Sequence, residues 1–197
     1  MNEQLSLIQR FRKTVIGEYA EALIWAVALA LVLTTFVVQA FKIPSGSMLV
    51  NKFLYGLRNP FNDDYLIRGV EPKVGDIIVF RYPKDRSLDY IKRIVGVPGD
   101  TLEMRNKVLY RNGVEVQEPY TQHSQPLIMI PGRDNWGPIT VPADKFFALG
   151  DNRDDSADSR FWGFLDRNDI RGKAWRIYWS ADGLSNIRLN RIGRAVE

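Results

Sequence analysis

The chain has no cysteine and only one histidine among its 197 residues. The absence of cysteine excludes thiol nucleophiles, disulfide bonds and cysteine-ligated metals, and it is compatible with a reducing or an oxidising compartment. The histidine, His123, lies in a polar stretch that we predict to be a solvated loop. One histidine cannot by itself supply a zinc site, and it argues against a serine-histidine triad. We therefore predict no metal and no other cofactor.

The chain also lacks a strong excess of charge, because its formal net charge is only +4 and the two signs are interspersed. A protein that binds nucleic acid usually carries a stripe or patch of lysine and arginine. We find no such stripe, so we predict no nucleic-acid partner. The mild positive charge favours attraction to anionic membrane lipid instead.

One long apolar run is present, and it is free of charged residues from 22 to 40. A helix of about 19 residues spans about 28 Å, close to the thickness of a bilayer core. We predict a cytoplasmic segment at 1–21, a transmembrane anchor at 22–40, and an extracytoplasmic domain at 41–197. A cleaved secretory signal and a buried soluble helix remain alternatives. Basic residues before the run weakly favour a cytoplasmic N-terminus.

The remainder of the chain alternates short β-rich runs with turn signals, which predicts a mainly β domain of antiparallel sheets. The clearest local feature is Asn112-Gly113, because this pair suits a type I′ turn between the runs 108–111 and 114–116. Other predicted strands lie at 77–82, 90–97, 101–104, 146–149 and 172–179. A hairpin-rich excursion is expected around 101–142, and its part at 117–142 looks irregular because it contains five prolines.

Two residues have the types needed for a serine hydrolase without histidine, namely Ser47 in Pro-Ser-Gly-Ser-Met and Lys92 in Tyr-Ile-Lys-Arg. A serine hydroxyl needs a partner that accepts its proton, and a lysine serves if burial keeps its amine neutral. Strand alternation would place Lys92 on one face with Tyr90 and Ile94. Taken alone, Ser47 also fits an ordinary turn, and Lys92 fits an exposed edge lysine.

A third cluster, residues 150–163, is dense in polar side chains that bind backbone and one another. We interpret it as a support for the lysine, with Ser156 as its hydrogen-bond partner and Asp151 and Arg153 as a candidate ion pair. A calcium loop starting at Asp154 is the first alternative, but the glycine and the closing glutamate that such a loop needs are missing. A solvated turn is the second alternative.

These clusters, in this order after one apolar run, resemble bacterial type I signal peptidases, which are membrane-bound Ser-Lys proteases. The resemblance extends from residue 36 to 179 and rests on four motifs, at 44–48, 75–80, 90–100 and 150–160. It implies a nucleophile at Ser47, a general base at Lys92, an oxyanion hole formed by Ser45 and Ser47, and a lysine-orienting role for Ser156. The implied substrate pocket comprises Phe41, Ile43, Val79, Tyr90 and Ile91. The implied structural support comprises Asp151, Arg153, Asp158 and Arg160.

The resemblance further implies a location in the bacterial inner membrane, with the catalytic domain on the periplasmic or extracellular side. Its partners would be the signal peptides of exported preproteins and membrane lipid. The sequence gives no indication of an oligomeric state. A cytosolic autoprotease of the repressor type shares the Ser-Lys pair, but the uncharged run argues against it.

The chain departs from the family pattern directly after Met48, where a segment is absent that would follow the nucleophile. Loss of about ten residues there would shift Ser47, and a displacement of about 1 Å can cost 100-fold in rate. The alternative function is therefore a catalytically impaired member of the family that binds exported chains without cleaving them.

Overall fold

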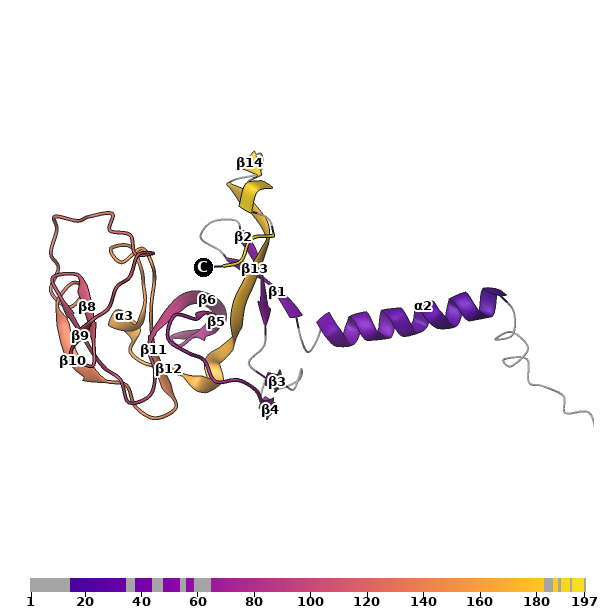
Figure 1. Cartoon of the computed structure of the whole chain (residues 1–197), viewed down its shortest axis with the longest axis horizontal. Coiled ribbons are helices and arrows are strands. Elements are labelled where there is room, and N and C mark those ends of the chain that lie inside the picture. Colours follow the sequence, from indigo (N-terminus) through magenta and orange to yellow (C-terminus); the bar gives the residue numbers. More distant parts are fainter. Residues whose placement is uncertain are drawn as a thin grey trace, which may run out of the picture.

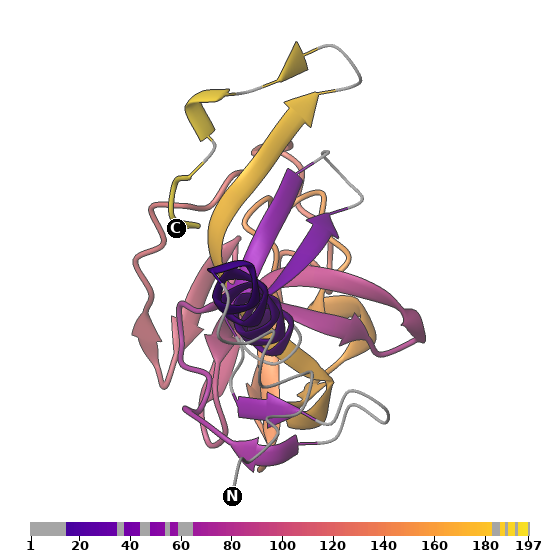
Figure 2. The ribbon, with the colours of Figure 1, turned by 90° about the vertical axis from the view of Figure 1, so that its right-hand side faces the viewer.

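The computed structural model describes residues 15–34, 38–43, 48–53, 56–58, 65–182, 186–187, 189–191 and 193–196. Its single long helix, α2, runs from Val15 to Val32 and extends away from the strands as a rod (Figure 1). In the view along this rod, the helix lies end-on in front of the strands (Figure 2). The described part of the chain therefore consists of a β-rich body and one projecting helix.

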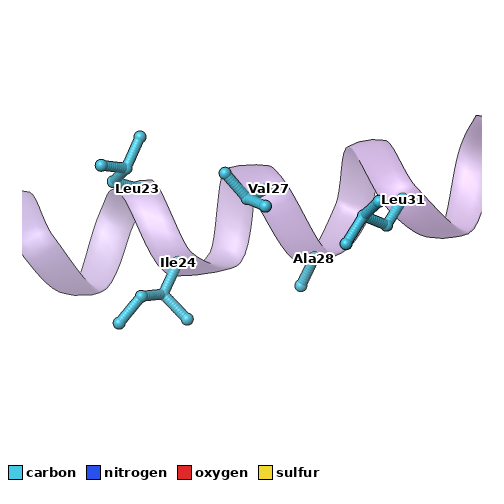
Figure 3. A pocket seen from close by; sticks show the side chains of 5 residues that line it. All are labelled: Leu23, Ile24, Val27, Ala28 and Leu31. Carbon is cyan, nitrogen blue, oxygen red and sulfur yellow. The ribbon is translucent and has the colours of Figure 1, made fainter.

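Helix α2 is apolar on all sides from residue 22 onward, and it leaves almost all of its side chains uncovered. Figure 3 shows five apolar side chains that project from it: Leu23, Ile24, Val27, Ala28 and Leu31. Trp25 is 69% exposed. A helix that is hydrophobic all round normally lies in a protein core or in a membrane. Within the described residues, the segment Val15–Thr34 is the one helix long and apolar enough to cross a bilayer.

The expected anchor at 22–40 overlaps this helix only in part, since strand β1 begins at Val38. The points at which the chain enters and leaves the bilayer, and the side on which each segment lies, stay predictions.

The main sheet is antiparallel and has eight strands in the order β1-β2-β13-β5-β6-β11-β12, with β14 paired to β13. Its strands are β1 (Val38–Ile43), β2 (Met48–Phe53), β5 (Ile77–Tyr82), β6 (Asp85–Gly96), β11 (Lys145–Leu149), β12 (Leu165–Asp166), β13 (Ile170–Asp182) and β14 (Asn186–Ile187). The predicted fold class is confirmed.

A second antiparallel sheet has the order β10-β7-β8-β9 and lies on the far side of the main sheet from α2 (Figure 1). Its strands are β7 (Thr101–Arg105), β8 (Val108–Arg111), β9 (Val114–Glu115) and β10 (Trp136–Thr140). The predicted hairpin is confirmed, because Asn112 and Gly113 have φ angles of 55° and 80° between the paired strands β8 and β9. Strand β10 was not predicted, because its proline and its glycine obscured the alternating pattern.

The remaining elements are short. They are the hairpin β3 (Gly56–Arg58) with β4 (Tyr65–Arg68), the helix α3 (Ser159–Trp162), and the 3₁₀ turns η2 (Arg167–Asp169) and η3 (Leu189–Arg191). Helix α3 begins at the cap residue Asp158, whose side chain accepts a hydrogen bond from the Arg160 backbone N–H.

Strands β6 and β11 have an apolar core on each of their two faces, because neighbouring side chains of a strand point in opposite directions. Ile94 packs in one cluster with Ile78 and Phe80, whereas its neighbour Val95 packs in the other with Leu102. All of these side chains are at most 2% exposed. The last four residues of β6, 93–96, are therefore held by burial on both faces, and Lys92 directly precedes them.

Candidate active site

Lys92 lies on β6 directly opposite Ile78 of β5, and alternation along β6 places it on the same face as Ile94. Ile78 and Ile94 are fully buried. The lysine is half-buried, and its Nζ donates a hydrogen bond of 2.8 Å to Ser156 Oγ. An amine at the edge of an apolar cluster with a neutral oxygen as its partner is in a suitable environment to lose its proton.

The electrostatic environment of Lys92 favours the neutral amine. Burial lowers its pKa from the usual value near 10.5, since the charged form loses hydration, and the nearby Arg160 lowers it as well. The carboxylate of Asp158 is the strongest influence in the opposite direction. The net effect is a lowered pKa, which increases the fraction of neutral amine at a given pH.

The backbone of Gly150 lies close to the Lys92 amine. The pairing of β11 with β6 brings Leu149 opposite Arg93, so Gly150 follows beside Lys92. A Cβ atom added to Gly150 would overlap Ser156 Oγ and would lie 2.7 Å from Ser156 Cβ and 3.3 Å from Lys92 Nζ. The site therefore has no space for a side chain at position 150.

The backbone of Gly150 is held by side chains on both of its polar groups. Its N–H donates to Asp158 Oδ2 at 3.1 Å, and its carbonyl oxygen accepts from Arg153 Nε at 3.1 Å. Asp158 also binds Arg160, and both of these side chains are at most 1% exposed. Charged pairs in such a dry setting are strongly oriented by their hydrogen bonds.

The predicted ion pair between Asp151 and Arg153 is wrong. Asp151 accepts two hydrogen bonds of 2.9 Å from Arg93, the neighbour of Lys92 on the opposite face of β6. Arg153 binds Glu118 instead, at 2.7 Å through each of two nitrogens. Glu118 was not predicted as a site residue, because it lies in the irregular segment 117–135 and is distant from residue 153 along the chain.

Asp154 is surrounded by basic side chains of the protein itself. Its side chain is fully buried and binds Lys107 at 2.5 Å, with Arg133 at 3.4 Å and His123 Nδ1 at 3.6 Å. Occupation of its oxygens by Lys107 and Arg133 leaves no place for calcium. His123 is only 26% exposed and lies beside a carboxylate, so its prediction as a solvated loop residue is wrong in this respect. No group of three or more histidine, aspartate or glutamate side chains suited to a metal occurs among the described residues.

Asp154 leads to a prediction for stability. Burial raises the pKa of its carboxyl group, but the hydrogen bonds from Lys107 and from the Gln125 N–H outweigh burial and lower it to about 2. Because the pKa is lower in the folded state, the stabilisation is present above the usual pKa of 3.8 and is lost as the pH falls through about 2. We expect Asp154→Asn to reduce the free energy of unfolding at pH 7 by about 3 kcal/mol.

Urea titrations at several pH values measure this effect. The variant should also lose less stability than the parent protein between pH 4 and pH 2. The adjacent, exposed Asp155 provides the matched control Asp155→Asn, which should change stability by less than about 0.5 kcal/mol. Equal losses in both variants would show that the buried cluster is not the cause.

The structure describes only some of the other predicted site residues. Ser45 and Ser47 lie outside the described residues, and Ser47 directly precedes β2. Phe41 and Ile43 belong to β1, of which only the backbone is described. Val79 is fully buried and pairs with Ile91 across β5 and β6. Tyr90 and Ile91 are half-buried on β6. Their roles toward a substrate stay predictions.

The comparisons with known proteins agree with the resemblance seen in the motifs. The family model described as signal peptidase, peptidase S26, matches residues 16–179. The chain is similar to a signal peptidase I of Pseudomonas aeruginosa, with 35% identity over 92% of this chain and 80% of that protein. It is also similar to a signal peptidase I P of Bacillus subtilis subsp. natto, with 37% identity over 90% of this chain and 94% of that protein.

Among solved structures, a signal peptidase I from Enterococcus faecalis matches with a TM-score of 0.44 and 33% identity, covering 53% of this chain and 97% of that chain. The β-rich fold and the family match together define a peptidase. The chain belongs to the signal peptidase family, peptidase S26.

Proposed function

We propose that this protein is a membrane-anchored serine endopeptidase that removes N-terminal signal peptides from exported preproteins after small-x-small sites. Ser47 is the nucleophile and Lys92 is the general base. The proposal is carried by the state of Lys92, whose amine has a lowered pKa and a hydrogen bond to Ser156. Membership of the signal peptidase family and the exposed apolar helix α2 support the choice of substrate and the membrane anchor.

In this mechanism Ser47 Oγ attacks the scissile carbonyl carbon while the neutral Lys92 amine accepts the hydroxyl proton. The negative charge that develops on the carbonyl oxygen is stabilised by the Ser45 hydroxyl and the Ser47 backbone N–H. The protonated Lys92 then donates its proton to the leaving amine. A water molecule hydrolyses the acyl-enzyme in the second half, and Lys92 acts again as the base.

Substrate selection follows from small apolar pockets lined by Phe41, Ile43, Val79, Tyr90 and Ile91. Such pockets accept alanine-sized side chains and reject larger ones by overlap. The substrate is expected to bind in an extended form, so alternate residues face the pockets and the small-x-small pattern results. In this proposal the helix anchors the protein in the inner membrane, and the site acts at the periplasmic or extracellular surface, where signal peptides leave the bilayer.

Cleavage of a preprotein by the full chain in detergent tests the proposal. The new N-terminus of the product, identified by mass spectrometry, should follow a small-x-small sequence. The rate should rise with pH, because only the neutral amine accepts a proton, and the apparent pKa should lie well below 10.5 because burial lowers it. A rise centred near the pKa of free lysine would contradict the proposed role of Lys92.

A catalytically impaired protein that binds exported chains is the second candidate, and the segment missing after Met48 favours it. Saturable binding of a signal peptide without any product, under conditions in which a cleaving relative is active, would establish this candidate instead.

A further inference from the structure

The segment 117–122, between β9 and β10, places two side chains against the loop that supports Lys92. Glu118 and Tyr120 come from this segment, and neither belongs to the motifs at 44–48, 75–80, 90–100 and 150–160. The segment is joined to the loop by backbone as well. The Gln122 N–H donates to the Asp151 carbonyl at 2.8 Å, and the Arg153 N–H donates to the Gln122 carbonyl at 2.9 Å. The second sheet is thus connected directly to the candidate active site.

Glu118 holds the arginine that binds the Gly150 carbonyl. Its two carboxylate oxygens each accept a hydrogen bond of 2.7 Å from Arg153, and the two side chains are 7% and 2% exposed. A two-point contact fixes the orientation of the guanidinium plane. Arg153 Nε then donates to the Gly150 carbonyl oxygen at 3.1 Å. Removal of Glu118 would leave the Arg153 cation buried without its partner, which is strongly unfavourable.

Tyr120 connects this pair with the arginine that binds Asp151. Its hydroxyl donates to Glu118 Oε1 at 2.9 Å, and its ring centre lies 3.8 Å from the Arg93 guanidinium carbon. Burial, together with the negative charge of Glu118, raises the pKa of Tyr120 to about 12, so the hydroxyl stays a donor at neutral pH. Arg93 in turn holds Asp151, the residue after Gly150.

We propose that Glu118 and Tyr120 are positioning residues for Lys92, which act by fixing Arg153 and Arg93 and thereby the backbone at Gly150. The inference rests on the proposed Ser-Lys function. Its physical basis is the close contact described above, because a Cβ on Gly150 would lie only 3.3 Å from Lys92 Nζ. A small movement of the Gly150 backbone therefore changes both the position and the hydration of the amine.

The charged groups that influence Lys92 come from the same loop and from the start of α3. They are Asp151, Asp155, Asp158 and Arg160. Three of these four are anions, which raise the pKa of the amine, whereas burial lowers it. Loosening of the loop would admit water and move the pKa upward toward its usual value. Loss of the Glu118 charge without any movement would have the opposite sign, because removing an anion lowers the pKa of a nearby amine.

The test uses Glu118→Gln in the full chain, purified in detergent. This variant keeps the shape of the side chain but loses its charge. We expect kcat to fall about 10- to 100-fold with KM changed less than about twofold, and the apparent pKa of the rate profile to rise. Tyr120→Phe keeps the ring beneath Arg93, removes only the hydroxyl, and should shift both quantities less in the same direction. The control is Glu115→Gln on β9, an exposed residue of the same chemical type, which should behave as the parent protein.

A second measurement separates this inference from the proposed reaction itself. The pKa of the Lys92 amine is determined in a Ser47→Ala background from the pH dependence of its labelling by an amine-reactive reagent, read by mass spectrometry. A higher pKa in Glu118→Gln supports positioning even if the Ser-Lys assignment is wrong. An unchanged or lowered pKa overturns it, even if the dyad is correct. A fall in kcat that matches the loss of folded protein, with an unchanged pH profile, also overturns it.

Discussion

Replacing Lys92 by methionine is expected to reduce preprotein cleavage by about 10⁴-fold or more, while the protein remains folded. Methionine has a similar length and no amine, so it fits beside Ile78 and Ile94 but cannot accept a proton. It also removes the cost of placing an amine in a half-buried site. We expect Ser47→Ala to cause a loss of similar size, because in the proposed mechanism the nucleophile and the base act in the same step.

The combination of both substitutions provides the sharper measurement. Residues that act as a unit give losses that do not add, so the double variant should be no slower than the worse single variant. The matched control is Lys145→Met on β11, whose amine forms a half-exposed ion pair with Asp166 at 2.7 Å. Lys145→Met should change activity little, since an exposed ion pair contributes at most about 1 kcal/mol to the free energy of unfolding. Wild-type cleavage by Lys92→Met would rule out the lysine as the base.

The Lys92→Met variant should also change the pH dependence of stability. Because burial lowers the pKa of Lys92 in the folded state, the unfolded chain binds the extra proton between that lowered value and 10.5. The free energy of unfolding therefore rises with pH across this window in the parent protein. Methionine removes this contribution, so the variant should lack this part of the rise.

Substitution of Gly150 by alanine is expected to lower kcat by about 100-fold, because the new methyl group would displace Ser156 and the Lys92 amine by a substantial fraction of an ångström. The overlap with Ser156 and the 3.3 Å approach to Lys92 Nζ are the cause. Backbone strain is not involved, since Gly150 does not have the positive φ that disfavours other residues. The expected signature is a slower reaction with a shifted pH profile in a folded protein.

The control for Gly150→Ala is Gly99→Ala. The first substitution causes steric overlap without backbone strain, and the second causes backbone strain without overlap. Gly99 has a φ of 88° and no atom within 4 Å of an added Cβ, so alanine there causes strain without overlap. We expect a lower unfolding temperature and an unchanged pH profile. A double-mutant cycle with Ser156→Gly completes the test, because removal of the obstructing side chain should reduce the additional cost of Gly150→Ala. Strict additivity would contradict the steric explanation.

Several strands were predictable because their signals are local. The Asn112-Gly113 turn defines the hairpin β8–β9 on its own, since both residues adopt positive φ. The strands β5, β6, β7 and β11 follow from alternating or continuous apolar runs. Strand β10 was not predictable in this way. Gly137 and Pro138 interrupt its pattern, and its pairing with β7 shows a register shift between Trp136 and Ile139.

The features of the candidate site also fall into two groups, those with a local sequence signal and those without one. The position of Lys92 on a core-facing strand was predictable from alternation, and Ser156 was predicted as its hydrogen-bond partner from the motif in which it lies. The ion pairs were not predictable, because opposite charges are abundant in the loop and nothing in the sequence selects among them. Asp151 pairs with Arg93, 58 residues away, and Arg153 pairs with Glu118, 35 residues away.

The sequence by itself determined the family, the apolar helix, the strand that carries Lys92 and the residue types available for proton transfer, because each of these depends on near neighbours in the chain. Only the tertiary structure decided which arginine holds which carboxylate, that Gly150 lies against the amine, and that Glu118 and Tyr120 from the irregular segment 117–135 reach the site. Those contacts depend on burial and on the packing of distant segments, which set the low-dielectric surroundings in which a lysine loses its proton.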